Sequence, residues 1–317
     1  MARIKYLDPR ADLTFKRIFG EHEDLAKSFL NALLPFEEGE EIETIEFLPA
    51  ELVPDTPLKK DTIVDVRCKD NRGRQFIVEM QMFWTETFMQ RVLFNASKAY
   101  VRQLDKGEHY NYLQPVYSLN IINDIFFPDL KEFYHLYNIV NVEHTDKIIE
   151  GLHFVLVELP KFKPQSVLDK KMMVLWLRFL TEMGDVTNDV PEEFTQNPEI
   201  NKAVGLLRES SYSDAQLLGY EKFWDIVRVE YAVKYDARKE GYRDGMEKGL
   251  QQGLQQGLQQ GLQQGLEKGL QQGLQQGMEK GRKAQTLEIA RSLKALHVSM
   301  ADIAKATGLA EAEIENL

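Results

Sequence analysis

The sequence has few of the features that define secreted, disulfide-bonded or membrane proteins. Only one cysteine, Cys68, occurs among its 317 residues, which excludes an intramolecular disulfide and a cysteine-based zinc site. No run of 18 apolar residues is present, and the first residues, MARIKYLDPRADL, contain no apolar signal core. We therefore expect a cytoplasmic protein that does not span a membrane.

The motifs of several large enzyme classes are absent as well. The lack of a G-x-x-x-x-G-K-[ST] loop, G-x-S-x-G elbow, H-E-x-x-H pair or C-x-x-C motif removes most nucleotide-binding, serine-hydrolase, zinc-protease and redox functions. The formal net charge of -11 argues against a general nucleic-acid coat. The charge is unevenly distributed, however, because residues 59–106 carry ten Lys and Arg against six Asp and Glu.

This basic window contains a stretch, residues 61–81, whose pattern predicts a β-hairpin. Two runs rich in Val, Ile and Phe flank the sequence DNRG at 70–73, where glycine accepts the positive φ that a turn requires. If residues 71–73 form a three-residue loop, Asp65 lies opposite Glu79. The same register predicts one apolar face, made by the pairs Val66 and Val78, Val64 and Met80, and Cys68 and Phe76.

The other face of the hairpin is polar and includes Asp65, Arg67 and Glu79. Like charges directly opposite each other destabilise a strand pair, so the Asp65–Glu79 pair needs an offset. Lys59, Lys60 or Arg67 could provide a cation, one carboxyl could have a raised pKa, or a divalent metal could bind. From the hairpin alone, a solvated face of an antiparallel sheet is the simpler interpretation.

The rest of the chain up to about residue 241 predicts a mixture of helices and strands. Asp8 and Pro9 indicate the start of a first helix that ends at Gly20, and Thr85 the start of a helix to about Leu104. Strands are expected at Ile42–Leu48, Pro115–Ile125, Phe133–Val142 and His153–Leu159, and further helices at His22–Leu34, 167–180, 201–210 and 220–241.

The helix expected at 85–104 has two contrasting sides. Its apolar stripe consists of Met89, Val92, Leu93, Ala96, Ala99 and Tyr100. The opposite side carries Arg91, Asn95, Lys98 and Arg102 in one continuous stripe. Such a row could follow a phosphate backbone, although from the helix alone a solvated face is favoured.

From Gly241 to Gly281, glycine recurs at every fourth residue, mostly in the pattern G(L/M)(Q/E)(Q/K). In a helix the glycine stripe would turn by about 40° per repeat, so it would not form a heptad seam. The eleven glycines would destabilise a helix by about 10 kcal/mol relative to alanine, so an isolated helix is not expected. The alternatives are a self-associating helix and a disordered linker, and we favour the helical, oligomerising arm.

The tail, residues 285–317, predicts two or three short helices, with Ser299 as an N-cap and Gly308 at a turn. This pattern resembles a helix-turn-helix. Phosphates would be repelled by Glu311, Glu313 and Glu315 in the second helix, which favours a packing or dimerising tail.

Several of these features resemble a known nuclease family. The pattern D-x(13)-E-x-Q formed by Asp65, Glu79 and Gln81, preceded by DLTFKRIFG and followed by a Gln-Arg-bearing helix, resembles the PD-(D/E)xK nuclease superfamily. It is most similar to the Rpn family of recombination-promoting nucleases and transposase-like proteins, in which a Gly-rich four-residue repeat is also typical. The resemblance covers about residues 8–160.

This resemblance implies a restriction-endonuclease-like α/β fold, a mixed sheet flanked by helices, and Mg²⁺-dependent cleavage of DNA. Asp65 and Glu79 would hold one or two Mg²⁺ ions, a hard cation that carboxylates bind together with substrate phosphate. Gln81 stands where the superfamily has lysine, so it could orient the attacking water but could not supply a charge or take a proton.

The resemblance also implies contacts to DNA. Arg91, Lys98 and Arg102 would meet phosphates, and Lys16 is a further candidate. Asp12 is a candidate extra ligand, although for both Asp12 and Lys16 a structural role is favoured.

We therefore predict four segments: a nuclease-like core at 1–162, a helical extension at 163–240, the repeat arm at 241–284 and the tail at 285–317. The leading hypothesis is a Mg²⁺-dependent DNA endonuclease linked to recombination or transposition. The alternatives are a catalytically weak or inactive nuclease fold that binds DNA or assembles, and a protein-interaction scaffold based on the repeat and the acidic tail.

Overall fold

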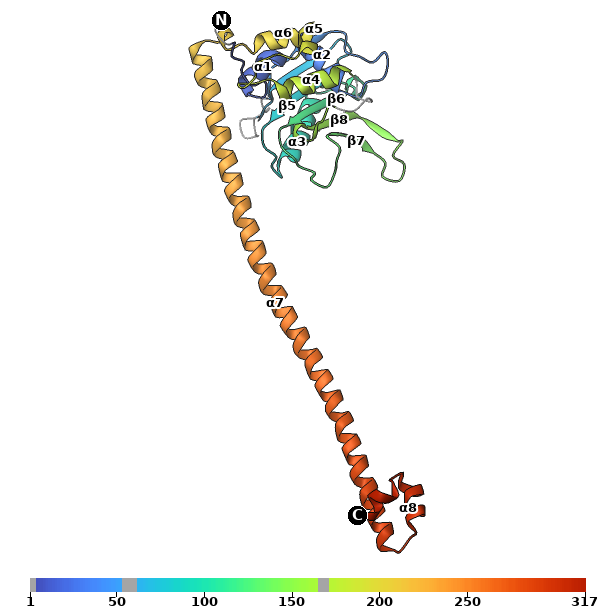
Figure 1. The fold of residues 1–317 in the computed structure, drawn as a ribbon. Coiled ribbons are helices and arrows are strands. Elements are labelled where there is room, and N and C mark those ends of the chain that lie inside the picture. Colours follow the sequence, from blue (N-terminus) through green and yellow to red (C-terminus); the bar gives the residue numbers. More distant parts are fainter. Residues whose placement is uncertain (1–3, 53–61, 165–170) are drawn as a thin grey trace. The chain divides into compact units, whose positions relative to one another are not determined.

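Figure 1 shows the computed structural model of the protein, which describes residues 4–52, 62–164 and 171–317. The chain divides into two compact units, Met1–Tyr231 and Ala232–Leu317. The first unit contains α1 (Asp12–Gly20), α2 (Glu23–Leu33), β1 (Ile45–Phe47), β2 (Glu51–Leu52), β3 (Thr62–Ile63), β4 (Val66–Asp70), β5 (Gln75–Gln81), α3 (Phe88–Val101), β6 (Val116–Ile122), β7 (Tyr134–Val140), β8 (Ile148–Glu158), α4 (Lys171–Glu182), α5 (Glu192–Gln196) and α6 (Pro198–Leu206). Short 3-10 helices lie at Tyr110–Tyr112, Leu159–Lys161 and Glu209–Ser211.

One mixed sheet forms the centre of the first unit. Its strands lie in the order β1-β4-β5-β6-β8-β7, and β2 pairs separately with β3. Strands β5, β6 and β8 are parallel to one another, while β4 and β7 are antiparallel to their neighbours. Helix α3 makes the crossover from β5 to β6 that a parallel pair requires. The mixed α/β, restriction-endonuclease-like fold expected from the sequence is confirmed.

Helices cover both faces of this sheet (Figure 1). On one face α1, α2, α4 and α6 share a hydrophobic core with the strands. In this core, Phe15, Phe29 and Trp176 of the helices belong to the same cluster as Val78 and Leu119 of the sheet. On the other face α3 packs against the sheet through its own apolar side chains. The polar hairpin face that we interpreted as solvated is therefore covered by α3, and that interpretation is wrong.

The hairpin register is confirmed. Cys68 pairs with Phe76 and Val66 pairs with Val78, and Gly73 has the positive φ of 82° that the three-residue loop needs. The prediction that the strand continues without a break before Val66 is wrong, however. The chain bends at Asp65, and β4 begins one residue later. As a result Val64 packs on the α3 face of the sheet instead of the face that contains Val66.

Two predicted helix starts and one helix face also differ from the structure. Helix α1 starts at Asp12, four residues after Asp8, whose carboxylate accepts from the backbone and the guanidinium of Arg10. Helix α3 starts after Thr87 instead of Thr85. On α3, Leu93 is 52% exposed and Asn95 is buried, which reverses the expected roles of these two side chains.

Helices α4 and α6 belong to the same hydrophobic core as the sheet. The segment predicted as a helix at 167–180 is described from Lys171 onward, where α4 begins. The segment boundaries that we proposed from the sequence, at residues 162, 240 and 284, stay a prediction. The contacts within the structure divide the chain between residues 231 and 232.

The repeat is helical. Helix α7 (Asp214–Ala295) runs without a break through every repeat, and it is followed by α8 (Met300–Thr307) and α9 (Glu311–Glu315). As expected, Ser299 caps α8 and Gly308 ends it in the left-handed conformation. The last turns of α7 pack against α8 and α9 through Ala290, Ile303 and Ile314. Within the described parts of the chain, no helix combines the length and the apolar character needed to cross a membrane.

Candidate active site

Asp65 lies at the bend where the chain enters β4, beside the end of β5. Its Oδ2 accepts a hydrogen bond of 2.7 Å from the Met80 backbone N–H, which fixes the direction of the carboxyl group. Burial raises the pKa of Asp65 to about 6, and the negative charges of Asp12 and Glu79 add to this rise. The bend therefore places the Asp65 carboxyl against β5 at Met80, the residue that follows Glu79 in this strand.

A lysine from α1 reaches the same carboxyl group. Lys16 Nζ lies 3.7 Å from Asp65 Oδ1 and 2.6 Å from Asp12 Oδ1, so this ammonium group stands between two carboxylates. Burial alone would lower the pKa of Lys16, but the hydrogen bond and charge of Asp12, together with Asp65, raise it. Lys16 is therefore a fixed positive charge at the edge of the site.

Glu79 is the more buried of the two predicted ligands, with 8% of its side chain exposed. Asn95 of α3 donates a hydrogen bond of 2.8 Å to Glu79 Oε1, and Arg91 Nη2 lies 3.6 Å from Oε2. Burial raises the pKa of Glu79, although the hydrogen bond from Asn95 and the charge of Arg91 oppose this rise. Two members of the stripe predicted on α3 therefore face the carboxyl group.

Gln81 also contacts α3. Its Nε2 donates to the Phe83 carbonyl at 2.9 Å, and its Oε1 accepts from Arg91 Nη2 at 2.6 Å. The Arg91 guanidinium in turn lies over the Phe88 ring, 4.9 Å from the centroid. Arg91 is thus the residue that joins Gln81 and Glu79.

The other two predicted DNA contacts on α3, Lys98 and Arg102, lie further along the helix than Arg91 and Asn95. Arg102 is exposed near the end of α3, and Lys98 Nζ lies 5.8 Å from the centroid of the Phe94 ring. Burial and the nearby charge of Arg102 lower the pKa of Arg67. Positive charge therefore extends along this side of α3, while Lys59 and Lys60 lie outside the described residues.

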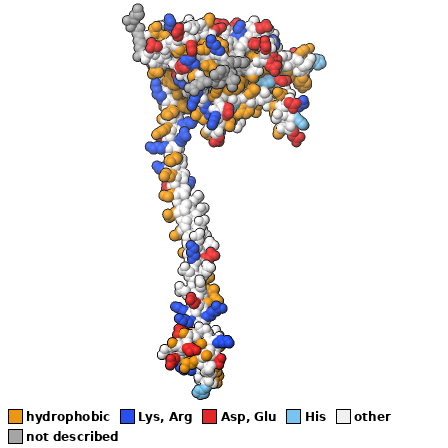
Figure 2. Space-filling view, turned by 45° about the vertical axis from the view of Figure 1, so that its right-hand side comes forward, with side chains coloured by type: hydrophobic (Ala, Val, Ile, Leu, Met, Phe, Trp, Pro, Cys, Tyr) orange, Lys and Arg blue, Asp and Glu red, His pale blue; other side chains and the backbone are white. Residues whose placement is uncertain are grey.

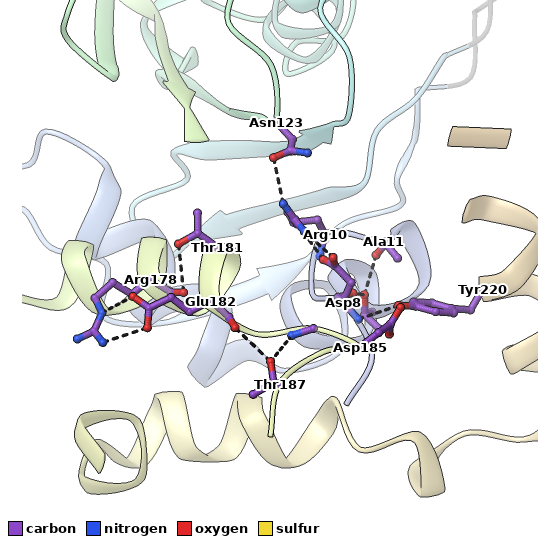
Figure 3. Close-up of polar contacts among 12 residues, drawn as sticks. Asp8, Arg10, Ala11, Asn123, Arg178, Thr181, Glu182, Asp185, Thr187 and Tyr220 are labelled. Atoms are coloured by element: carbon purple, nitrogen blue, oxygen red, sulfur yellow. Dashed lines mark hydrogen bonds and ion pairs between the residues drawn. The ribbon is translucent and has the colours of Figure 1, made fainter. Parts of the chain in front are cut away.

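A network of hydrogen bonds supports the strand ends beside the site (Figure 3). Asn123, directly after β6, donates from its backbone N–H to the Gln81 carbonyl, and its side chain accepts from Arg10. Arg10 binds both carboxylate oxygens of Asp8, whose own N–H donates to the hydroxyl of Tyr220 on α7. The N-terminal segment and the start of α7 are therefore fixed to the same sheet edge as Gln81.

The contact in the candidate site that the sequence did not identify is the hydrogen bond from Asn95 to Glu79. The helical spacing of Asn95 and Arg91 was the available signal, since it places both on one side of α3. The direction in which this side faces could not be read from the spacing.

Comparison with known families identifies the first unit. The family model described as "PD-(D/E)XK nuclease family transposase" matches residues 9–231, which is more than half of the chain. The chain belongs to this family. A second model, described as "Essential protein Yae1, N terminal", matches residues 241–279 within the repeat. No curated protein and no solved structure matches the chain.

In this PD-(D/E)XK protein, the two predicted metal ligands have the same pattern of hydrogen bonds. Each carboxyl group has one oxygen fixed by a short hydrogen bond, Oδ2 of Asp65 and Oε1 of Glu79. The other oxygens, Oδ1 and Oε2, have only cations at 3.7 and 3.6 Å as partners among the described residues.

Within residues 4–52, 62–164 and 171–317, no three His, Cys, Asp or Glu side chains are grouped to hold a metal. A pair of carboxylates nevertheless fits Mg²⁺, which keeps several waters and binds through one or two carboxylates together with substrate phosphates.

Proposed function

We propose that this member of the PD-(D/E)XK nuclease family is a Mg²⁺-dependent DNA endonuclease in which Asp65 and Glu79 are the metal ligands. The observation that carries the proposal is the orientation of the two carboxyl groups. Each uses one oxygen for a hydrogen bond to the protein and keeps the other directed at a more distant cation. Two neighbouring carboxyls with raised pKa values are a site where a divalent cation would relieve the repulsion.

Hydrolysis of a phosphodiester adds one water across a P–O bond and leaves a phosphate on one product end and a hydroxyl on the other. When bound, the metal would polarise the scissile phosphate and lower the pKa of the attacking water. Asp65 and Glu79 would hold this ion, and the Met80 N–H and Asn95 fix the directions of their carboxyl groups. Lys16 is proposed to hold positive charge near the phosphate, and Lys98 and Arg102 to contact neighbouring phosphates.

The alternative is a nuclease fold with weak or no catalytic activity that binds DNA or serves in assembly. The basic side of α3 would also bind DNA in a protein without catalytic activity, so it does not distinguish the nuclease from this alternative. A role in recombination or transposition is part of the leading proposal, and the word transposase in the family description supports the second of these. DNA as the substrate is consistent with the cytoplasmic location expected from the sequence.

Cleavage of supercoiled plasmid in Mg²⁺ tests the proposal. The wild type is compared with Asp65→Asn, Glu79→Gln and a matched control, Glu46→Gln, which alters an exposed carboxyl on β1 paired with Lys69. We expect the wild type and the control to nick the plasmid, and the two site variants to be slower by a factor of about 100 or more. Equal nicking by all four proteins would contradict the proposal, and DNA binding without cleavage by the wild type would favour the alternative.

We further propose that the repeat arm forms a homo-oligomer. Leu254, Leu258, Leu262 and Leu266 each remain about three-quarters exposed on α7. Figure 2 shows such hydrophobic side chains recurring along the helix among uncharged ones. A helix with a glycine in every repeat lacks intrinsic stability, so burial of these leucines against other copies would supply it.

Sedimentation equilibrium of the full chain tests the arm. We expect an oligomer for the wild type and a shift toward monomer when these four leucines are replaced by glutamine. A monomeric wild type would contradict this proposal.

A further inference from the structure

Gln81 occupies the position at which the superfamily pattern has lysine, and both ends of its amide are engaged. Nε2 donates to the Phe83 carbonyl at 2.9 Å, which fixes the amide so that Oε1 points toward α3. Oε1 then accepts the hydrogen bond of 2.6 Å from Arg91 Nη2. The direction of the Gln81 side chain is therefore set by these two partners.

Arg91 is well placed to act on a substrate. Asn95 occupies Glu79 Oε1, so Oε2 is the oxygen of this carboxylate that remains for a metal ion. Arg91 Nη2 lies 3.6 Å from this same Oε2, and its side chain is 44% exposed. A phosphate bound at the metal would thus be within reach of the Arg91 guanidinium, which lies over the Phe88 ring.

The chemistry of arginine suits this position. Its planar guanidinium presents five N–H donors that match the oxygens of a phosphate, and it keeps its charge at every working pH. The negative charge that develops on a phosphate during hydrolysis is stabilised most by donors that are already oriented. Neutral Gln81 offers no such charge, whereas Arg91 brings one to the same point.

We propose that Arg91 is a catalytic residue that contacts the scissile phosphate, and that Gln81 is the positioning residue that holds it there. This inference rests on the proposed nuclease function and deepens it. In the other role considered for Gln81, orientation of the attacking water, its effect on the rate would not depend on Arg91. The two roles are therefore separable by experiment.

A double-mutant cycle separates these roles. Single-turnover cleavage is measured for the wild type, Arg91→Ala, Gln81→Ala and the double variant. We expect Arg91→Ala to slow cleavage by a factor of about 100 and Gln81→Ala by a smaller factor. Adding Gln81→Ala to Arg91→Ala should have almost no further effect, because Gln81 acts through Arg91.

Equal effects of Gln81→Ala in both backgrounds would overturn the positioning role. Full activity of Arg91→Ala would overturn the catalytic role. Calorimetry with Ca²⁺ accompanies the cycle, and retained metal binding by all four proteins would show that the carboxyl site is intact.

DNA binding gives a readout that does not require cleavage. With Ca²⁺ present, the slope of log affinity against log salt should fall by about one for Arg91→Ala, because one phosphate contact is lost. Arg228→Ala is the matched control, since Arg228 is exposed on α7 and paired with Asp225; its slope should equal that of the wild type. An unchanged slope for Arg91→Ala would overturn the phosphate contact. If the slope falls for Arg91→Ala but the wild type does not cleave DNA, only the proposed nuclease function is overturned.

Discussion

The Asp65 carboxylate, a proposed metal ligand, lowers the free energy of unfolding of the protein. Burial raises the pKa of its carboxyl to about 6, so at neutral pH the folded protein contains a charge that the unfolded chain carries more easily. Asparagine removes the charge and retains an oxygen that can accept from the Met80 N–H. We therefore expect Asp65→Asn to be more stable than the wild type above about pH 7.

The size and the pH dependence follow from the pKa. A shift from the ordinary 3.8 to about 6 corresponds to at most about 3 kcal/mol at neutral pH. Asparagine also removes the charge that faces Lys16 at 3.7 Å, so we expect a gain of about 1–2 kcal/mol. Because the folded-state pKa is the higher one, the destabilisation is absent below about pH 4, develops up to about pH 6 and is constant above about pH 7.

Urea unfolding followed by tryptophan fluorescence measures this difference, since all three tryptophans lie in the first unit. Asp70→Asn is the control on the same hairpin. The Asp70 side chain is fully buried and 2.7 Å from Arg74 Nε, so this substitution should destabilise by about 3 kcal/mol. A lower stability of Asp65→Asn at pH 8, or a difference that is the same at pH 4 and pH 8, would refute the reasoning.

Three further predictions concern the metal, Asn95 and the repeat. Ca²⁺ affinity measured by calorimetry should rise from about pH 5 to pH 7, because protons compete for Asp65, whose pKa is about 6; a flat profile would contradict this. Asn95→Ala should move the midpoint of that profile upward, because Glu79 loses the donor that opposes its raised pKa, and an unchanged midpoint would exclude this role. Alanine at Gly253, Gly257 and Gly261, where a Cβ meets nothing within 4 Å, should stabilise the helix by about 1 kcal/mol per site. Circular dichroism should show this as a helical signal that persists to a higher temperature. The same substitutions should weaken self-association in sedimentation if the glycines lie at the contact between copies; unchanged association would place the contact elsewhere.

Local patterns predicted the hairpin because its register depends on few residues. Gly73 fixes the loop, and the alternation of apolar residues excludes a shift by one position. The bend at Asp65 could not be predicted in this way, because its side chain, and not its backbone, takes the Met80 N–H.

Contacts between distant segments account for most of the other differences. Asp8 looked like a helix cap, but its N–H and carboxylate are used by Tyr220 and Arg10, and Tyr220 is 212 residues away. The polar face of the hairpin looked solvated, because the sequence does not show which side of α3 will cover it. Asn95 is buried there by its bond to Glu79, a partner 16 residues away.

Binding of Ca²⁺ by the wild type, Asp65→Asn and Glu79→Gln tests most directly whether the two carboxyl groups form one metal site. Calorimetry at about pH 7.5 avoids cleavage and reports the ion alone, with Glu46→Gln as the control for an exposed carboxyl. The account predicts a binding event in the wild type and the control that is lost in both site variants. Equal binding by all four proteins, or no binding by the wild type, would contradict the account.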